Sequence, residues 1–293
     1  MLAVLSTALP GASVAAARAH VRSQEVTTVP APAPTTTVPP TPNTTAPPPP
    51  PPAAQPAPPA PKPAPAPTPP PAPAPAPALR GWIPPNNPPA NMPPAPNFLQ
   101  SCSGSAYDDS PGCVNASLAA INNARAQEGL PGMGLPTNWT QLSPTQQLFV
   151  ATNLERTVRG LAPLQAMATA LDQAADQGAQ QNTDPSAPAG FPYTQWGSNW
   201  AGAVGNPLEA MYYWMYDDGM GSSNVDCTPS NQSGCWGHRD NVLMKLKCQM
   251  CVFGGGFEAT AYQGTPSLAE ILVDSSGQPA VDFTWQQEQA YLS

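Results

Sequence analysis

The sequence predicts an α+β domain that follows a disordered, proline-rich arm. Of the 45 Pro residues, 32 fall between Pro30 and Pro96. This tract has few large apolar side chains and few backbone donors, so we expect it to stay extended and outside any core. Beyond it, helical apolar periodicity comes first along the chain, and apolar runs with strand character come later. That order is typical of α+β packing.

The chain divides into four expected parts. Residues 1–19 are expected to be a signal peptide, because an apolar run from Leu2 ends in the small-x-small triplet Ala17-Arg18-Ala19. Residues 20–101 form the Pro/Ala/Thr-rich linker, residues 102–142 an extension with one helix, and residues 143–293 the main domain. The leader is shorter than the roughly 20 residues that cross a bilayer, so we expect no transmembrane segment after processing.

Helix signals follow in order along the domain. Asn115–Glu128 carries apolar residues at helical spacing and stops at a Gly. Ser143 followed by Pro144 marks the start of a second helix, which Gly160 ends. A third helix is expected from Leu164 through Gly178, where apolar and small residues recur on one face.

The last part of the domain contains a fourth helix and an antiparallel strand pair. Asn206-Pro207-Leu208-Glu209 has the pattern of a capping box, and the helix that it opens ends near Asp217. The runs 250–253 and 267–273 are apolar, and Gly-rich and Pro-containing segments separate them, so they predict two antiparallel strands.

Composition narrows the function classes. Residues 102–293 carry 17 Asp and Glu against 6 Lys and Arg. Nucleic acid is therefore not expected as a partner, since its binding depends on clustered basic residues.

Six Cys all lie in the acidic part of the chain, and an even number in an exported protein favours three disulfides. Short separations favour pairing Cys102 with Cys113, Cys227 with Cys235, and Cys248 with Cys251. Two alternatives stay open: zinc held by the last four Cys, and a redox pair in Cys248-Gln-Met-Cys251.

Two segments carry a family resemblance. Asn153–Leu164, with the sequence NLERTVRGLAPL, and Gly237–Leu243, with the sequence GHRDNVL, resemble signature segments of the CAP superfamily. This family groups cysteine-rich secretory, antigen five and pathogenesis-related proteins with bacterial SCP-like secreted proteins. Gly197–Ala201 and the helix around Trp214 lie between them in the family's order. The resemblance spans roughly residues 143–282 and implies a three-layer α-β-α sandwich with a cleft between helices and sheet.

The resemblance also implies a set of cleft residues. Family members often place two His and two acidic residues there, and some hold a divalent metal. Matched motif by motif, His238 keeps its His, Gly178 stands for the other His, Ser198 for one acid and Asp217 for the other. Asn199 and Trp214 accompany them in the cleft. One imidazole with one Asp is a poor metal site, so we expect no resident cofactor beyond a weakly held divalent cation.

Each candidate also has a structural interpretation. His238 is expected to titrate near neutral pH. It is either held by hydrogen bonds that brace the turn at the start of a helix, or it lines the cleft. Asp217, Asp218 and Asp226 either hold Ca²⁺ with loop carbonyls or form a solvated helix end. The aromatic residues between Trp196 and Trp236 either pack in the core or floor a groove for sugar rings or lipid.

These observations favour a secreted or wall-associated, bacterial CAP-like module that binds a cell-envelope or extracellular component such as a glycan, lipid or protein. No spacing in the sequence demands catalysis. An alternative is an extracellular hydrolase of wall polymers or peptides that uses His238 with a nearby acid such as Asp217. A second alternative is a wall scaffold or adhesion protein whose functional part is the Pro-rich arm, which could span an envelope in the polyproline II conformation.

Overall fold

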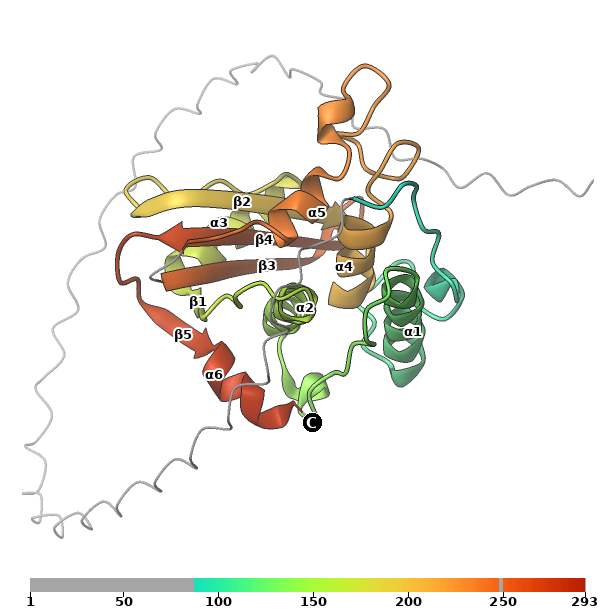
Figure 1. The fold of residues 1–293 in the computed structure, drawn as a ribbon, viewed down its shortest axis with the longest axis horizontal. Coiled ribbons are helices and arrows are strands. Elements are labelled where there is room, and N and C mark those ends of the chain that lie inside the picture. Colours follow the sequence, from blue (N-terminus) through green and yellow to red (C-terminus); the bar gives the residue numbers. More distant parts are fainter. Residues whose placement is uncertain (1–86, 248–249, 293) are drawn as a thin grey trace, which may run out of the picture. The chain divides into compact units, whose positions relative to one another are not determined.

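A computed structural model describes residues 87–247 and 250–292 (Figure 1). The expected leader and most of the expected linker lie outside the described residues. The α-helices are α1 (Pro111–Gln127), α2 (Pro144–Val158), α3 (Thr169–Gln181), α4 (Pro207–Tyr216), α5 (Gly237–Val242) and α6 (Trp285–Glu288). The strands are β1 (Ala166–Ala168), β2 (Tyr193–Gly202), β3 (Met250–Tyr262), β4 (Thr265–Ser275) and β5 (Val281–Thr284). This mixture confirms the α+β class.

The strands of the described residues form one sheet in the order β2-β4-β3-β1-β5. β3 and β4 are an antiparallel hairpin joined by Gln263 and Gly264, which have φ angles of 53° and 85°. Two consecutive positive φ angles give the turn whose twist matches that of the strands. β2 pairs with β4 over its whole length and forms one edge of the sheet.

Helix α3 covers one face of the sheet. Residues 254 and 256 of β3 point to this face, and both are Gly. A Cβ at Gly254 would lie 2.3 Å from backbone atoms of Leu171, and a Cβ at Gly256 would lie 2.1 Å from those of Ala175. The glycines therefore let the backbone of α3 pack directly on the strand.

Helix α2 covers the opposite face, as the close approach of Gly255 to Thr145 shows. α4 packs on α2 and α1, and α5 packs on α4 and β2. The helices therefore lie on both faces of the sheet (Figure 1). The sheet separates a large hydrophobic cluster beneath α2 and α4 from a small one beneath α3.

A buried ionic network ties the first helices together. Glu155 of α2 is fully buried and contacts Arg125 of α1, Arg159 directly after α2 and the hydroxyl of Tyr216 in α4. Burial raises the pKa of Glu155, but the two guanidinium groups more than offset this and hold the pKa below its ordinary value. Removal of one member of this network would leave a buried charge without its partner, which is strongly destabilising.

The end of the expected linker belongs to the folded domain, which corrects the boundary at residue 101. Phe98 is completely buried and packs edge-on against Tyr212 and Tyr213 of α4. The backbone of Met92 donates to the Tyr216 carbonyl and accepts from the Tyr212 hydroxyl, each at 2.8 Å. The large apolar residue Phe98 just after the last Pro residues of the tract was the available sequence signal. The high Pro content of the preceding residues led to its assignment to the linker.

Two secondary-structure predictions need correction. The expected third helix starts later than Leu164, since Ala166–Ala168 is strand β1 and α3 begins at Thr169. Alternation cannot be seen over a run of three small and apolar residues. Strand β2 was not predicted, although it contains the motif Gly197–Ala201. The predicted first, second and fourth helices and the predicted strand pair are confirmed.

Two of the three predicted disulfides are present, Cys102–Cys113 and Cys227–Cys235. Cys251 is also disulfide-bonded, while Cys248 lies outside the described residues. Within the described part of the chain, none of the helices combines the length and the apolar character that a bilayer span requires.

Candidate ligand site at His238

Helix α5, which carries His238, lies along the edge strand β2. The Asn241 side chain donates to the Ser198 carbonyl at 2.7 Å and to the Asn199 side-chain oxygen at 2.9 Å. In return, the Asn199 amide donates to the His238 carbonyl at 3.1 Å. A Cβ at Gly197 would lie 2.6 Å from Asn241, so the Gly leaves room for this contact. The motif residues of β2 and α5 thus fix the position of His238.

Asp218 orients His238 from behind. His238 Nδ1 lies 2.7 Å from Asp218 Oδ1, and the backbone N–H of His238 donates to Oδ2 at 3.1 Å. The Asp218 side chain is 1% exposed and that of His238 is 13% exposed. The carboxylate also accepts from the Asn224 amide at 2.7 Å. A carboxylate partner at Nδ1 favours a proton on that nitrogen, and in the neutral ring this leaves Nε2 for a ligand.

Two further carboxylates complete the cluster. Asp184 follows α3, Asp226 belongs to the loop before α5, and both are exposed. One ligand atom from each of Asp184, Asp226 and His238 lies within 4.8 Å of the others. Residues 42 positions apart in the chain are therefore brought to one point at the open edge of β2.

The charges of this cluster shift its pKa values. The residue Asp184 is exposed, but protein atoms around its carboxyl group displace water and raise its pKa. The charge of His238 opposes this shift, and the charge of Asp226 adds to it. For His238, burial lowers the pKa, but the hydrogen bond and charge of Asp218, with Asp184 and Asp226, raise it overall. The site thus concentrates negative charge around one imidazole and attracts cations.

The arrangement has the composition of a divalent-cation site. Two carboxylate oxygens and one imidazole nitrogen suit several divalent metals, and three protein ligands leave positions for water or a ligand. A buried carboxylate behind the coordinating His is the usual partner that fixes the tautomer and ring orientation. The sequence predicted an imidazole with one Asp, whereas the structure brings the carboxylates of Asp184 and Asp226 close to it.

The other predicted residues lie nearby in different roles. Asp217 ends α4 but does not hydrogen-bond to His238; its neighbour Asp218 does. Asn199 is fully buried and supports α5. Ser198 contributes its backbone carbonyl, while its side chain points to the α3 face by strand alternation. Trp214 is 2% exposed and packs in the core, where its indole N–H donates to the Trp200 carbonyl.

Gly178 explains how Asp184 reaches the site. A Cβ at Gly178 would lie 2.9 Å from the Thr183 carbonyl oxygen and 3.1 Å from the Pro185 ring. The Gly therefore allows the chain to turn sharply after α3, and this turn carries Asp184. Sequence reasoning missed Asp184, because the acid belongs to no motif and the turn brings it back to the sheet edge. The only available signal was the Asp-Pro pair directly after a helix end.

Glu270 of β4 lies buried in the same helix-covered face. It accepts hydrogen bonds from Thr152 at 2.7 Å and from Asn199 at 2.8 Å. Burial raises its pKa to about 7, although both hydrogen bonds, Arg156 and His238 oppose the shift. The Asn199 side chain thus connects Glu270 to the backbone of His238 and helps to hold His238 in position.

A comparison of the chain with family models, with curated proteins and with solved structures found no match. The likeness to the CAP superfamily therefore rests on the sequence motifs named above.

Proposed function

We propose that the protein is an exported, CAP-like module that binds an envelope or extracellular ligand through a divalent cation held by Asp184, Asp226 and His238. The observation that carries this proposal is the convergence of these three side chains within 4.8 Å, with buried Asp218 behind the imidazole. The cation would supply open coordination positions for an oxygen-bearing ligand.

The spatial relation of the two motif segments supports the CAP-like part of the proposal. The first segment begins in the last turns of α2 and continues beyond its end, and the second segment forms α5. Arg156 of the first donates through Nη1 to the Val242 carbonyl of the second at 2.7 Å and to the Met244 carbonyl at 3.1 Å. Segments more than 80 residues apart in the chain thus form one hydrogen-bonded unit beside the sheet.

Disulfides support the extracellular part. Cys102–Cys113 joins the segment before α1 to α1, and Cys227–Cys235 closes a short loop that begins directly after Asp226. Disulfides persist in oxidising compartments and are rare in a reducing cytosol.

Calorimetric titration of the full chain with MnCl₂, ZnCl₂ and CaCl₂ tests the proposal. We expect at least one of these cations to bind the wild type, and Asp184→Asn to weaken that binding at least about tenfold because one anionic ligand is lost. Asp109→Asn is the matched control, since Asp109 is an exposed acid outside the cluster. Equal affinities of the Asp184 variant and the wild type would contradict the proposal.

Ligand binding is tested with an insoluble cell-wall preparation. The wild type should sediment with it in the presence of the bound cation and should be released by EDTA. The Asp184 variant should stay in the supernatant. Equal sedimentation with and without EDTA would show that binding to the cell wall does not require the cation.

One observation favours a second function, hydrolysis. The pair formed by His238 and Asp218 at 2.7 Å is the usual arrangement of a general base and its orienting acid. Among the described residues, no Ser, Thr or Cys side chain hydrogen-bonds to His238, so a nucleophile would have to be water. Turnover of wall material by the wild type that disappears in His238→Ala would favour the hydrolase over the binding module.

A further inference from the structure

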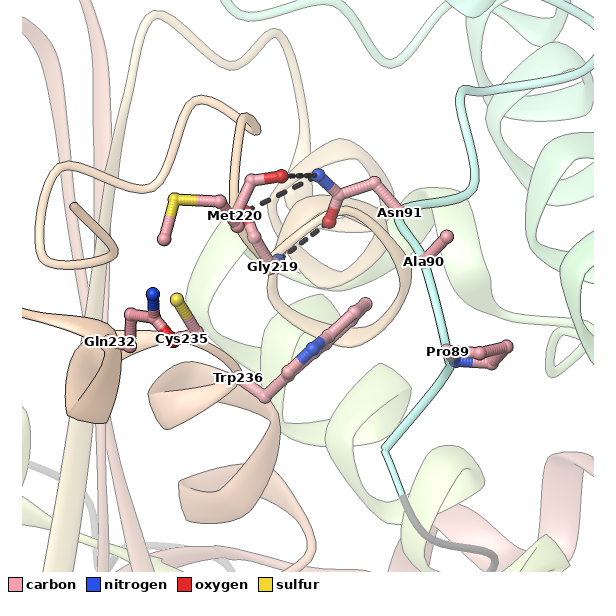
Figure 2. Close-up of a pocket in the computed structure, with 8 residues that line it drawn as sticks. All are labelled: Pro89, Ala90, Asn91, Gly219, Met220, Gln232, Cys235 and Trp236. Carbon is pink, nitrogen blue, oxygen red and sulfur yellow. Dashed lines mark hydrogen bonds between the residues drawn. The ribbon is translucent and has the colours of Figure 1, made fainter. Parts of the chain in front are cut away.

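A cavity lies between the end of the Pro-rich arm and the loops that precede α5 (Figure 2). Its volume is about 340 Å³, at the lower end of the range for small-molecule sites. Its walls come from Pro89–Asn91, from Gly219 and Met220 after α4, and from Gln232, Cys235 and Trp236 before α5. Neither the proposed cation ligands nor the sequence motifs include these residues, apart from the aromatic candidate Trp236.

Trp236 is held in an unusual backbone conformation. Its φ angle is 63°, in the left-handed region that a bulky residue rarely adopts. The Trp236 N–H donates to the Asp218 carbonyl at 3.1 Å, and the Trp236 carbonyl accepts from the Asp240 N–H at 2.9 Å. Strained backbone of this kind persists where surrounding contacts impose it, and it concentrates at ligand sites.

The indole of Trp236 does not serve the core. Trp236 is partly exposed and belongs to neither hydrophobic cluster of the described residues. Trp214, in contrast, is 2% exposed within the large cluster. Figure 2 shows the ring extending between Gly219 and the arm end. A Cβ at Gly219 would lie 2.8 Å from the ring, so the absence of a side chain at this position leaves room for the indole.

Hydrogen bonds and a disulfide hold the walls of the cavity in place. The Asn91 side chain accepts from the Gly219 N–H at 2.6 Å and donates to the Met220 carbonyl at 3.0 Å. Cys235 is disulfide-bonded to Cys227, and Asn224 donates to the Gly234 carbonyl at 2.9 Å. Walls that are already fixed lose little conformational entropy on binding.

The lining combines one aromatic face with polar groups that have free hydrogen-bonding capacity. The Gln232 side chain is exposed and makes no hydrogen bond to the described residues. Met220 is 44% exposed and adds apolar surface. Nearby Asp217, Asp218 and Asp226 disfavour an anionic ligand. A ligand with an apolar face, a rim of hydroxyl groups and no negative charge fits this lining, and a neutral pyranose ring has these properties.

We infer that the Trp236 cavity is a saccharide subsite, in which the indole stacks on one neutral sugar ring and Gln232 hydrogen-bonds to its hydroxyl groups. This inference rests on the proposed binding function and names its ligand class as an uncharged glycan.

Titration calorimetry of the full chain with cellotetraose and with chitotetraose tests the inference. At least one tetrasaccharide should bind the wild type, and Trp236→Gly should weaken that binding about tenfold or more. Gly suits the positive φ angle, so this variant should fold. Gln232→Ala, at an exposed position, should also weaken binding. Tyr193→Ala, which removes a 45% exposed aromatic side chain elsewhere, should bind as the wild type does.

Three results would overturn the inference: no binding of either tetrasaccharide, equal binding by the Trp236 variant, or binding of a polyproline decapeptide in place of the sugars. The last result would assign the cavity to a proline-rich segment. Cation titration of the same samples separates this failure from failure of the proposed function. Loss of sugar binding with intact cation binding refutes the saccharide subsite alone, whereas absent cation binding with intact sugar binding refutes the cation site alone.

Discussion

At the scale of single residues, the site depends on which of two adjacent carboxylates faces His238. Sequence reasoning selected Asp217, but Asp218 is the residue that bonds to the imidazole and to the first N–H groups of α5. Neighbouring positions at a helix end point in different directions, and spacing alone does not determine which side chain turns inward. Asp217 is half-buried and Asp218 is almost completely buried.

These two acids give a matched pair of variants. Asp218→Asn removes the charge that orients the imidazole, so we expect a loss of cation affinity of about 10- to 100-fold, the usual effect of removing such a supporting carboxylate. Asp217→Asn should change the affinity less than about threefold, because Asp217 does not contact the ring. Calorimetric titration of both variants measures the difference. Equal losses in the two would show that Asp218 has no special role.

Glu209 predicts how stability depends on pH. It is 1% exposed, and burial raises its pKa to about 7 although the Gly205 N–H opposes the shift. Between pH 4.5 and 7 the folded state keeps the proton that the unfolded chain has released, so stability falls as the pH rises through this window. The loss of unfolding free energy across this window is on the order of 3 kcal/mol.

Glu209→Gln should therefore unfold at a higher urea concentration than the wild type at pH 7.5. At pH 5 the two should be closer, since the wild-type carboxyl group is then protonated. Urea denaturation at the two pH values measures this. If the difference in unfolding free energy between wild type and variant were the same at pH 7.5 and at pH 5, Glu209 would not be a buried, protonated acid.

At the scale of secondary-structure elements, the packing of α3 on β3 depends on two glycines. Gly256→Ala would place a methyl group 2.1 Å from the backbone of Ala175, where no side chain can move away. We expect a loss of about 1–3 kcal/mol or more in unfolding free energy from this overpacking. Gly104→Ala is the control, since its Cβ would meet no atom within 4 Å. Urea denaturation that gave equal stability for the two variants would contradict the close packing.

The same elements show what could be predicted from the sequence. Helix α2 was predictable because Ser143 and Pro144 form a local start signal, and the Ser143–Gln146 capping box is present. Strand β2 was not predictable, since its aromatic and small residues acquire strand structure through pairing with β4, more than 60 residues later. The candidate site shows the same contrast between residues with a local sequence signal and residues placed by distant contacts. His238 has a motif, whereas Asp184 reaches it through a turn that depends on Gly178.

At the scale of the whole molecule, the described domain and the Pro-rich tract are expected to be thermodynamically separate. The hydrophobic clusters of the described residues begin at Met92. Deletion of residues 29–77 should therefore leave the thermal unfolding transition of the domain within about 2 °C of that of the full chain. Differential scanning calorimetry measures this, and loss of the transition would show that the tract contributes to the core.

The adjoining segment predicts the opposite. Phe98 is completely buried between Tyr212 and Tyr213, so Phe98→Ala should lower the unfolding free energy by about 3–5 kcal/mol. Leu99→Ala is the neighbouring control, because half of Leu99 is exposed. Urea denaturation of the two variants places the start of the folded domain before or after residue 98, and equal stabilities would place it after.

The central claim is that Asp184, Asp226 and His238 act together as ligands of one divalent cation. Anomalous diffraction from crystals of the full chain grown with MnCl₂ tests it most directly. The account predicts one anomalous peak at bonding distance from a carboxylate oxygen of each Asp and from Nε2 of His238, with Asp218 still bonded to Nδ1. Absence of a peak between these three side chains, in crystals where the three are ordered, would contradict it.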